Sequence, residues 1–126
     1  MINKVFLLGR LGRDPEIRYT ESGTAVATFS MATDRTWKKD GETQKQTDWH
    51  RVVAFGRTAE VVGEYCKQGS LIHVEGRMQT RSYEDKEGIT RWTTEVIVTG
   101  LKLVGTKNGG QRREEPPPPG EEDVPF

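Results

Sequence analysis

The sequence has a single cysteine, Cys66, and only two histidines, His50 and His73, among its 126 residues. One cysteine cannot form an internal disulfide, and these three side chains cannot assemble a Cys/His zinc site. Scarce cysteine is also typical of a reducing compartment. We therefore expect a cytoplasmic protein that holds no metal and needs no cofactor.

Long hydrophobic runs are missing too. The chain has no uninterrupted apolar stretch of about 18 residues, the length that a membrane-spanning helix needs. The apolar run near the N-terminus, around Phe6, is too short for the core of a signal peptide. We therefore expect a soluble protein with no membrane partner.

An excess of charge of either sign is absent from the chain as a whole, which has 19 Lys and Arg, 19 Asp and Glu, and a pI of about 6.7. This balance alone gives no reason to expect a polyanionic partner. The average hides a division, however. Residues 1–106 carry 16 basic and 14 acidic residues, a net charge of +2, whereas residues 107–126 carry 3 and 5, a net charge of −2.

The apolar fraction of 33% and the mean hydropathy of −0.74 are low for one compact domain, which indicates a polar segment without a core. We expect one folded domain in residues 1–106, a disordered linker in residues 107–120 and an acidic tip in residues 121–126. The linker has adjacent glycines and four successive prolines, a composition that buries too little apolar surface to fold. The tip is either a solubilising tail or a docking peptide. The C-terminal Phe126 favours docking, because an exposed aromatic adds nothing to solubility.

The pattern of apolar residues predicts strands separated by Gly-rich or polar turns. The main strands are expected at residues 3–11, 24–37, 46–56, 70–78 and 92–104, with a short continuation of the first at residues 16–19. Residues 38–43 form a polar hairpin loop, and residues 79–91 a second, longer hairpin.

Between the third and fourth strands the period changes to that of a helix. Ala59, Val62 and Cys66 share one apolar stripe, Thr58 is placed to cap the start, and Gly69 is a natural stop. We interpret Cys66 as a buried structural thiol. Three strands, a helix and two strands is the order of a five-stranded Greek-key barrel of the OB type, so the fold class is all-β with one helix.

The strand at residues 46–56 carries the most informative side chains. Alternation places Trp49, Arg51 and Phe55 on one face, with His50 and Val52 on the other. Two aromatics beside a guanidinium suit a flat anionic partner with exposed rings, which single-stranded nucleic acid offers. Burial in the core is the commoner fate of aromatics in strands, so from this stretch both interpretations stay open.

Several short motifs occur in an order that resembles the bacterial single-stranded DNA-binding protein family, over nearly the whole chain. The motifs are Asn3-Lys4-Val5, Gly9-Arg10-Leu11-Gly12-Arg13-Asp14-Pro15-Glu16, Thr47-Asp48-Trp49-His50-Arg51-Val52-Val53 with Phe55-Gly56, Val74-Glu75-Gly76, Thr93-Thr94-Glu95-Val96, and the acidic end with Val124-Pro125-Phe126. Each motif alone is weak, and their succession makes the match specific.

The resemblance implies an OB barrel that assembles as a homotetramer and coats single-stranded DNA, without sequence preference, during replication, recombination and repair. It implies a nucleoid-associated protein of the cytoplasm that is not an enzyme. The DNA-binding residues carried over are the stacking aromatics Trp37, Trp49, Phe55 and Tyr83 and the phosphate-binding Lys4, Arg51, Arg57 and Arg81.

The same resemblance places His50 at a subunit interface, and the first strand, residues 4–11, is the edge that we expect to pair between subunits. It also implies that the tip recruits partner proteins of replication and repair. The tip residues are Glu121, Glu122, Asp123, Val124, Pro125 and Phe126.

Three features depart from the family pattern. Tyr83 stands where well-known members have Trp, Glu-Glu-Asp-Val replaces the usual Asp-Asp-Asp-Ile, and the linker is short and proline-rich. Weaker stacking at Tyr83 and altered cooperativity between tetramers are the expected consequences.

Other functions fit parts of the same pattern. An RNA-binding OB module would use the same aromatic and basic face, and a small primosome adaptor should lack the acidic, Phe-terminated tail. A metal-dependent nuclease would need Asp48, Glu75 or Glu95, which are scattered singly among strands without a paired-carboxylate motif.

Overall fold

The computed structural model describes residues 1–105, so the predicted linker and acidic tip lie outside the described residues. Six strands and one helix make up this range. They are β1 (Val5–Leu11), β2 (Glu16–Tyr19), β3 (Ala25–Lys39), β4 (Glu42–Phe55), α1 (Arg57–Tyr65), β5 (Leu71–Glu84) and β6 (Thr90–Gly105).

Five of these strands form a closed barrel. The order of the sheet is β1-β5-β6-β4-β3-β2, and a further pairing of β1 with β3 joins its two sides. Neighbouring barrel strands are antiparallel except β4 and β6, which run parallel. The short strand β2 lies outside this ring, paired with β3. The prediction of a five-stranded OB barrel with one helix is therefore confirmed.

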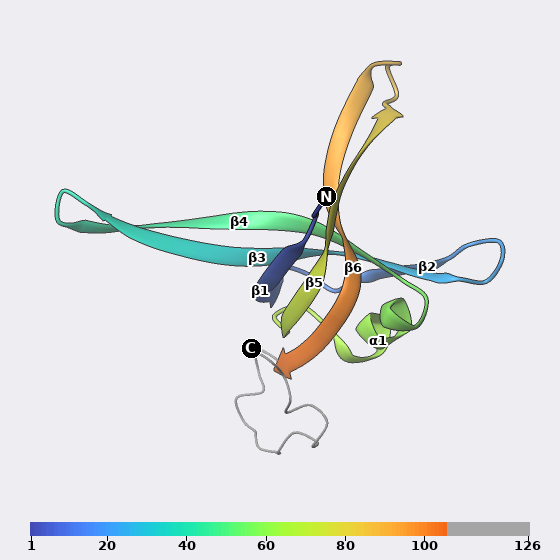
Figure 1. Cartoon of the computed structure of the whole chain (residues 1–126), viewed down its shortest axis with the longest axis horizontal. Helices are drawn as coiled ribbons and strands as arrows, with labels where there is room; N and C mark the ends of the chain where they lie inside the picture. Colours follow the sequence, from blue (N-terminus) through green and yellow to red (C-terminus); the bar gives the residue numbers. More distant parts are fainter. Residues whose placement is uncertain (106–126) are drawn as a thin grey trace.

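Two long hairpins project from the barrel in different directions (Figure 1). Strands β3 and β4 stay paired as far as Lys39 and Glu42, so the predicted loop at residues 38–43 shrinks to Asp40 and Gly41. Both of these have positive φ, 54° and 81°, the combination that a tight hairpin turn needs and that Asp-Gly adopts readily.

The second hairpin is also strand for most of its length, because β5 reaches Glu84 and β6 starts at Thr90. The carboxylate of Asp85 fixes its turn. It accepts hydrogen bonds from the backbone N–H of Glu87 and Ile89, both at 2.9 Å, and pairs with Arg91 at 2.9 Å.

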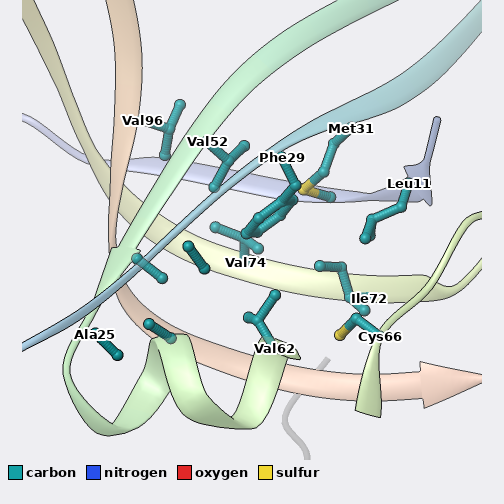
Figure 2. Packing of buried hydrophobic residues seen from close by; sticks show 13 residues of the cluster. Leu11, Ala25, Phe29, Met31, Val52, Val62, Cys66, Ile72, Val74 and Val96 are labelled. Carbon is teal, nitrogen blue, oxygen red and sulfur yellow. The ribbon is translucent and has the colours of Figure 1, made fainter. Parts of the chain in front are cut away.

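The core fills the barrel and extends to the inner side of the helix (Figure 2). Strand β3 alternates, with Ala27, Phe29 and Met31 buried and Thr28 and Ser30 between them only partly covered. Opposite them, Val52, Ile72 and Val74 are fully buried. The apolar cluster reaches Val62 and Cys66 at the helix, and helix α1 therefore closes one end of the core.

The helix begins and ends earlier than expected. Gly56 is its N-terminal cap and no side chain caps it, so the predicted capping role of Thr58 is wrong. It ends at Tyr65, not near Gly69. Beyond the helix, the backbone N–H groups donate to side chains instead of to helix carbonyls. The N–H of Lys67 donates to Ser70 Oγ at 2.9 Å, and the N–H of Gln68 donates to the Asp14 carboxylate at 2.8 Å.

Cys66 follows the helix and is 7% exposed, as the buried-thiol interpretation expects. Burial raises the pKa of its thiol to about 11, because the apolar surroundings disfavour the charged thiolate. Across residues 1–105, no helix has the length and apolar character needed to span a membrane.

Candidate nucleic-acid interface

Strand β4 presents its aromatic residues to solvent. Trp49 is 60% exposed and Phe55 48% exposed, while Val52 and Ala54, of opposite parity to these aromatics, are fully buried. Arg51 is exposed and Val53, also between the two aromatics, is largely covered. Of the two interpretations of this strand, the exposed one holds for both aromatic residues.

Phe55 and Arg51 lie on the wall of a cleft of about 320 Å³ that crosses five strands. Strand pairing builds it, because Val53 of β4 is aligned with Thr28 of β3 on one side and Ile97 of β6 on the other. The outward side chains of these strands and of β2 and β5 therefore share one face. The residues that line the cleft are Glu16, Arg18, Val26, Thr28, Arg51, Val53, Phe55, Gln79, Arg81, Glu95 and Ile97.

Two arginines and one carboxylate meet in this cleft. Glu95, only 3% exposed, accepts a hydrogen bond from Arg81 Nε at 2.7 Å on Oε1 and one from Arg51 Nε at 3.4 Å on Oε2. The side chains of both arginines are about half exposed. The cleft therefore offers cationic groups at its surface although its floor holds a buried negative charge.

The same two arginines extend the surface onto the β5–β6 hairpin. Arg51 and Arg81 line a neighbouring hollow together with Tyr83 and Thr93. Tyr83 is 48% exposed, and its parity on β5 matches that of Arg81. Phe55, the arginine pair and Tyr83 thus form one continuous surface, which we call the arginine–aromatic face.

Trp49 joins this face from the other side. It lines a hollow with Gly12, Arg13 and Ser30, and a groove that it shares with Arg51. Its ring lies so close to Gly12 that a Cβ at this position would collide with the six-membered ring of the indole. The glycine therefore leaves the room that the indole occupies.

Three of the predicted DNA-binding residues lie away from the arginine–aromatic face. Trp37, 41% exposed, is far along the β3–β4 hairpin, where the Arg35 guanidinium lies 5.3 Å from its ring centroid. Lys4 pairs with Glu75 at 2.9 Å, and Arg57 at the start of α1 lies 3.9 Å from Glu60. None of the three lines the hollows described above.

The carboxylates that a nuclease would need are each engaged separately. Asp48 pairs with Arg35 at 3.2 Å, Glu75 with Lys4, and Glu95 with the two arginines. In the described part of the chain, no group of three or more His, Cys, Asp and Glu side chains could hold a metal ion.

Comparison with known proteins identifies the family of the chain. The sequence model of the single-strand binding protein family matches residues 2–104. The chain belongs to this family. The resemblance drawn from the sequence motifs is thus confirmed at the level of the family.

A solved structure supports the same assignment within the single-strand binding protein family. The Plasmodium falciparum SSB, in a complex with ssDNA, is 31% identical and superposes with a TM-score of 0.77. The match covers 82% of this chain and 96% of that chain. It therefore extends over most of the barrel domain.

His50 follows Trp49 on β4, and its side chain lies on the opposite face of the strand, as alternation predicts. It is half-buried, and its Nε2 lies 2.8 Å from Thr33 Oγ1. Nearby, β1 pairs with β5 from Val5 to Arg10, but with β3 only at Arg10 and Leu11. Most of β1 therefore has one unpaired edge within residues 1–105.

Several residues of the arginine–aromatic face were not singled out from the sequence as binding residues. Arg18, Gln79 and Glu95 line the main cleft, and Arg13 lies beside Trp49. A signal existed for Glu95, a charged residue that precedes the apolar run Val96-Ile97-Val98. Trp92, on the β5–β6 hairpin, is 70% exposed and was likewise not assigned to DNA binding.

Proposed function

We propose that this protein binds single-stranded DNA without sequence preference, through the arginine–aromatic face. The observation that carries the proposal is the continuous exposure of Trp49, Phe55 and Tyr83 around the Arg51–Arg81 pair. Every base has a face that can stack on an aromatic ring, at about 1–3 kcal/mol per base, so stacking tolerates any sequence. The arginines supply phosphate contacts and release counterions.

The small net charge of residues 1–106, +2, is compatible with this function. A nucleic-acid strand responds to the charges along its path, and Arg18, Arg51 and Arg81 line the cleft there. Family membership and the similarity to an SSB that was solved with ssDNA support the choice of ligand.

The proposed assembly is a homotetramer. The unpaired edge of β1 and the exposed Phe6 and Leu8, at 61% and 55%, support pairing of this strand with another copy. His50 is proposed to contact a neighbouring subunit, since it lies on the face of β4 opposite the aromatics. In such an assembly four arginine–aromatic faces could act on one strand.

In the cell, the proposed role is to coat and protect single strands during replication, recombination and repair, in the nucleoid of the cytoplasm and without catalysis. Residues 121–126 are proposed to recruit partner proteins, supported by three carboxylates followed by Val-Pro-Phe at the end of the chain. The Phe126 ring would enter an apolar socket, and the acidic side chains of Glu121, Glu122 and Asp123 would meet Arg or Lys of the partner. Lys4, Arg57 and Trp37 are proposed as outlying DNA contacts.

A competition experiment tests the proposal. The full chain is bound to fluorescent oligo-dT and challenged with equal nucleotide concentrations of unlabelled oligo-dT, duplex DNA and oligo-rU, with Mg²⁺ or Mn²⁺ present in parallel samples. We expect displacement by oligo-dT far below the concentrations at which duplex or rU compete, and an intact probe in every sample. Preferential displacement by rU would instead indicate an RNA-binding module, and a shortened probe would indicate a nuclease.

A further inference from the structure

Glu95 is the only charged side chain that is buried in residues 1–105. It lies on β6 beside the buried Val96 and Ile97, at the floor of the main cleft. Burying a carboxylate is unfavourable unless it is paired and hydrogen-bonded, so its position requires partners.

Those partners come from the two strands that flank β6. The sheet order β5-β6-β4 places Glu95 between Arg81 on β5 and Arg51 on β4. Each oxygen of the carboxylate serves one arginine, Oε1 for Arg81 at 2.7 Å and Oε2 for Arg51 at 3.4 Å. The carboxylate thus bridges two guanidinium groups that would otherwise repel each other.

Both arginines bind Glu95 through Nε. Inside residues 1–105, the terminal nitrogen atoms of both guanidinium groups make no hydrogen bond. These side chains are about half exposed and line the hollow that continues to Tyr83. The terminal nitrogen atoms, which are best suited to bind a phosphate, are therefore available, while Nε of each arginine is held by Glu95.

We propose that Glu95 is a positioning residue that holds Arg51 and Arg81 as a preformed pair for the phosphate backbone of the bound strand. The inference rests on the proposed function, because it assigns a role within the same DNA-binding face. Arginine side chains lose rotational freedom when they bind, and fixing them beforehand removes part of that loss. Glu95 itself makes no contact with the strand in this account.

The proposal and simple charge counting predict opposite signs for Glu95→Gln. Glutamine has nearly the same shape as glutamate but lacks the negative charge. Removing a negative charge from a surface that binds a polyanion should tighten binding if charge alone matters. Loss of the charged acceptor should weaken binding if Glu95 positions the arginines.

The experiment measures the Kd of full-length wild type and E95Q for oligo-dT at several salt concentrations. We expect E95Q to bind about tenfold more weakly, since the glutamine amide can accept from only one of the two arginines and turns its NH2 group toward the other. The slope of log K against log salt should fall in magnitude by about 0.7–1.4, the change for one or two lost phosphate contacts on a single strand. A purely structural role would leave this slope unchanged.

Glu64→Gln is the matched control. Glu64 is exposed on α1 and lines none of the hollows of the arginine–aromatic face. We expect E64Q to bind as tightly as wild type. Binding by E95Q that equals or exceeds that of E64Q would overturn the proposal.

Two further variants separate positioning from misfolding. Glu95→Asp keeps the charge, but its side chain is too short to reach both arginines, so we expect E95D to bind more weakly than wild type. Wild-type affinity of E95D would overturn the proposal. This test holds even if E95Q fails to fold. In an R51Q/R81Q background, E95Q should add no further weakening. If the wild type bound no DNA, the proposed function would be refuted. If wild type, E95Q and E95D all bound DNA with the same affinity, only the role of Glu95 would be refuted.

Discussion

Trp49 and Phe55 face solvent on a strand whose intervening residues Val52 and Ala54 are fully buried. Large aromatics are usually covered in a folded domain, and leaving both exposed on one face is typical of a contact surface. At the scale of single residues, the account depends on these rings stacking with bases.

Trp49→Ala and Phe55→Ala should each weaken oligo-dT binding by about 5- to 150-fold, the equivalent of about 1–3 kcal/mol for one stacked base. Both side chains lie outside the core, so the thermal midpoint of unfolding should change little. Fluorescence anisotropy gives the affinities. Tyr65→Ala is the control, because Tyr65 is 58% exposed but lies at the end of α1, away from the arginine–aromatic face. Unchanged binding in all three variants would refute the stacking assignment.

Cys66 provides a prediction about pH. Its pKa in the folded protein is raised to about 11, so the neutral thiol is the form that the fold stabilises. This contribution to stability is fully present below the ordinary thiol pKa of about 8.5 and is lost as the pH rises through 11. We expect the free energy of unfolding to fall over this window in wild type and to fall less in Cys66→Ala, as followed by denaturant titration.

The same residue should be chemically inert in the folded state. At pH 8, a thiol reagent should label Cys66 only as fast as the protein opens. Rapid labelling of native protein would contradict its burial.

How much could be predicted at this scale differs from residue to residue. Alternation along β4 was enough to separate Trp49 from His50, because the period of a strand is fixed by its geometry. The contacts of Glu95 with Arg51 and Arg81 could not be predicted, since they depend on the register of three strands that meet only in the folded barrel. Local sequence does not show that β4 lies beside β6, because these strands are not consecutive in the chain.

At the scale of elements, the order of strands followed from the sequence but their ends did not. The Asp40-Gly41 turn signal was present, yet polar residues on either side suggested a loop where β3 and β4 remain paired. Strands that project beyond a barrel have no buried face, so the hydrophobic alternation that marks a strand is missing there. The position of Trp37 on this extension explains why it lies apart from Trp49.

The turn of the β5–β6 hairpin depends on Asp85, which gives a prediction for acid pH. Hydrogen bonds from the backbone of Ile89 and from Arg91 lower the pKa of this carboxyl. A lowered pKa means that the ionised form stabilises the turn above the ordinary value of about 3.9, and that this support is lost as the pH falls through the lower, folded value.

We therefore expect the amides of Glu87 and Ile89 to stay protected from exchange at pH 5 and to lose protection in Asp85→Asn at the same pH. Native-state hydrogen exchange measures this. The barrel amides serve as the internal control, and their protection should be unaffected. Equal protection of the turn in both proteins would show that the carboxylate does not hold it.

The C-terminal tip is the element with the most separable role. A chain lacking residues 121–126 should retain oligo-dT binding, because the arginine–aromatic face lies wholly in residues 1–105. It should lose capture of replication and repair proteins from a lysate of a related cell. A full-length control with Phe126→Ala separates the contribution of the aromatic ring from that of the acidic residues. Loss of DNA binding on truncation would contradict the assignment of DNA binding to residues 1–105 and of partner binding to the tip.

At the scale of the whole molecule, one barrel offers two different surfaces. The arginine–aromatic face lies over β2 to β6, and the edge of β1 that β3 leaves unpaired is the second surface. The two adjoin, because Val5 and Leu7 of β1 line one groove with Trp49 and Arg51. If β1 pairs between copies, the partner copy is therefore placed beside the DNA-binding face.

The central claim is that an assembly of these barrels binds single strands. Native mass measurement with and without oligo-dT tests this claim most directly. We expect a species of four chains, each of 14.2 kDa, that gains the mass of bound oligonucleotide when the strand is added. A matched duplex should not be retained. Chains that stay single and carry no oligonucleotide would contradict the account, both in its assembly and in its ligand.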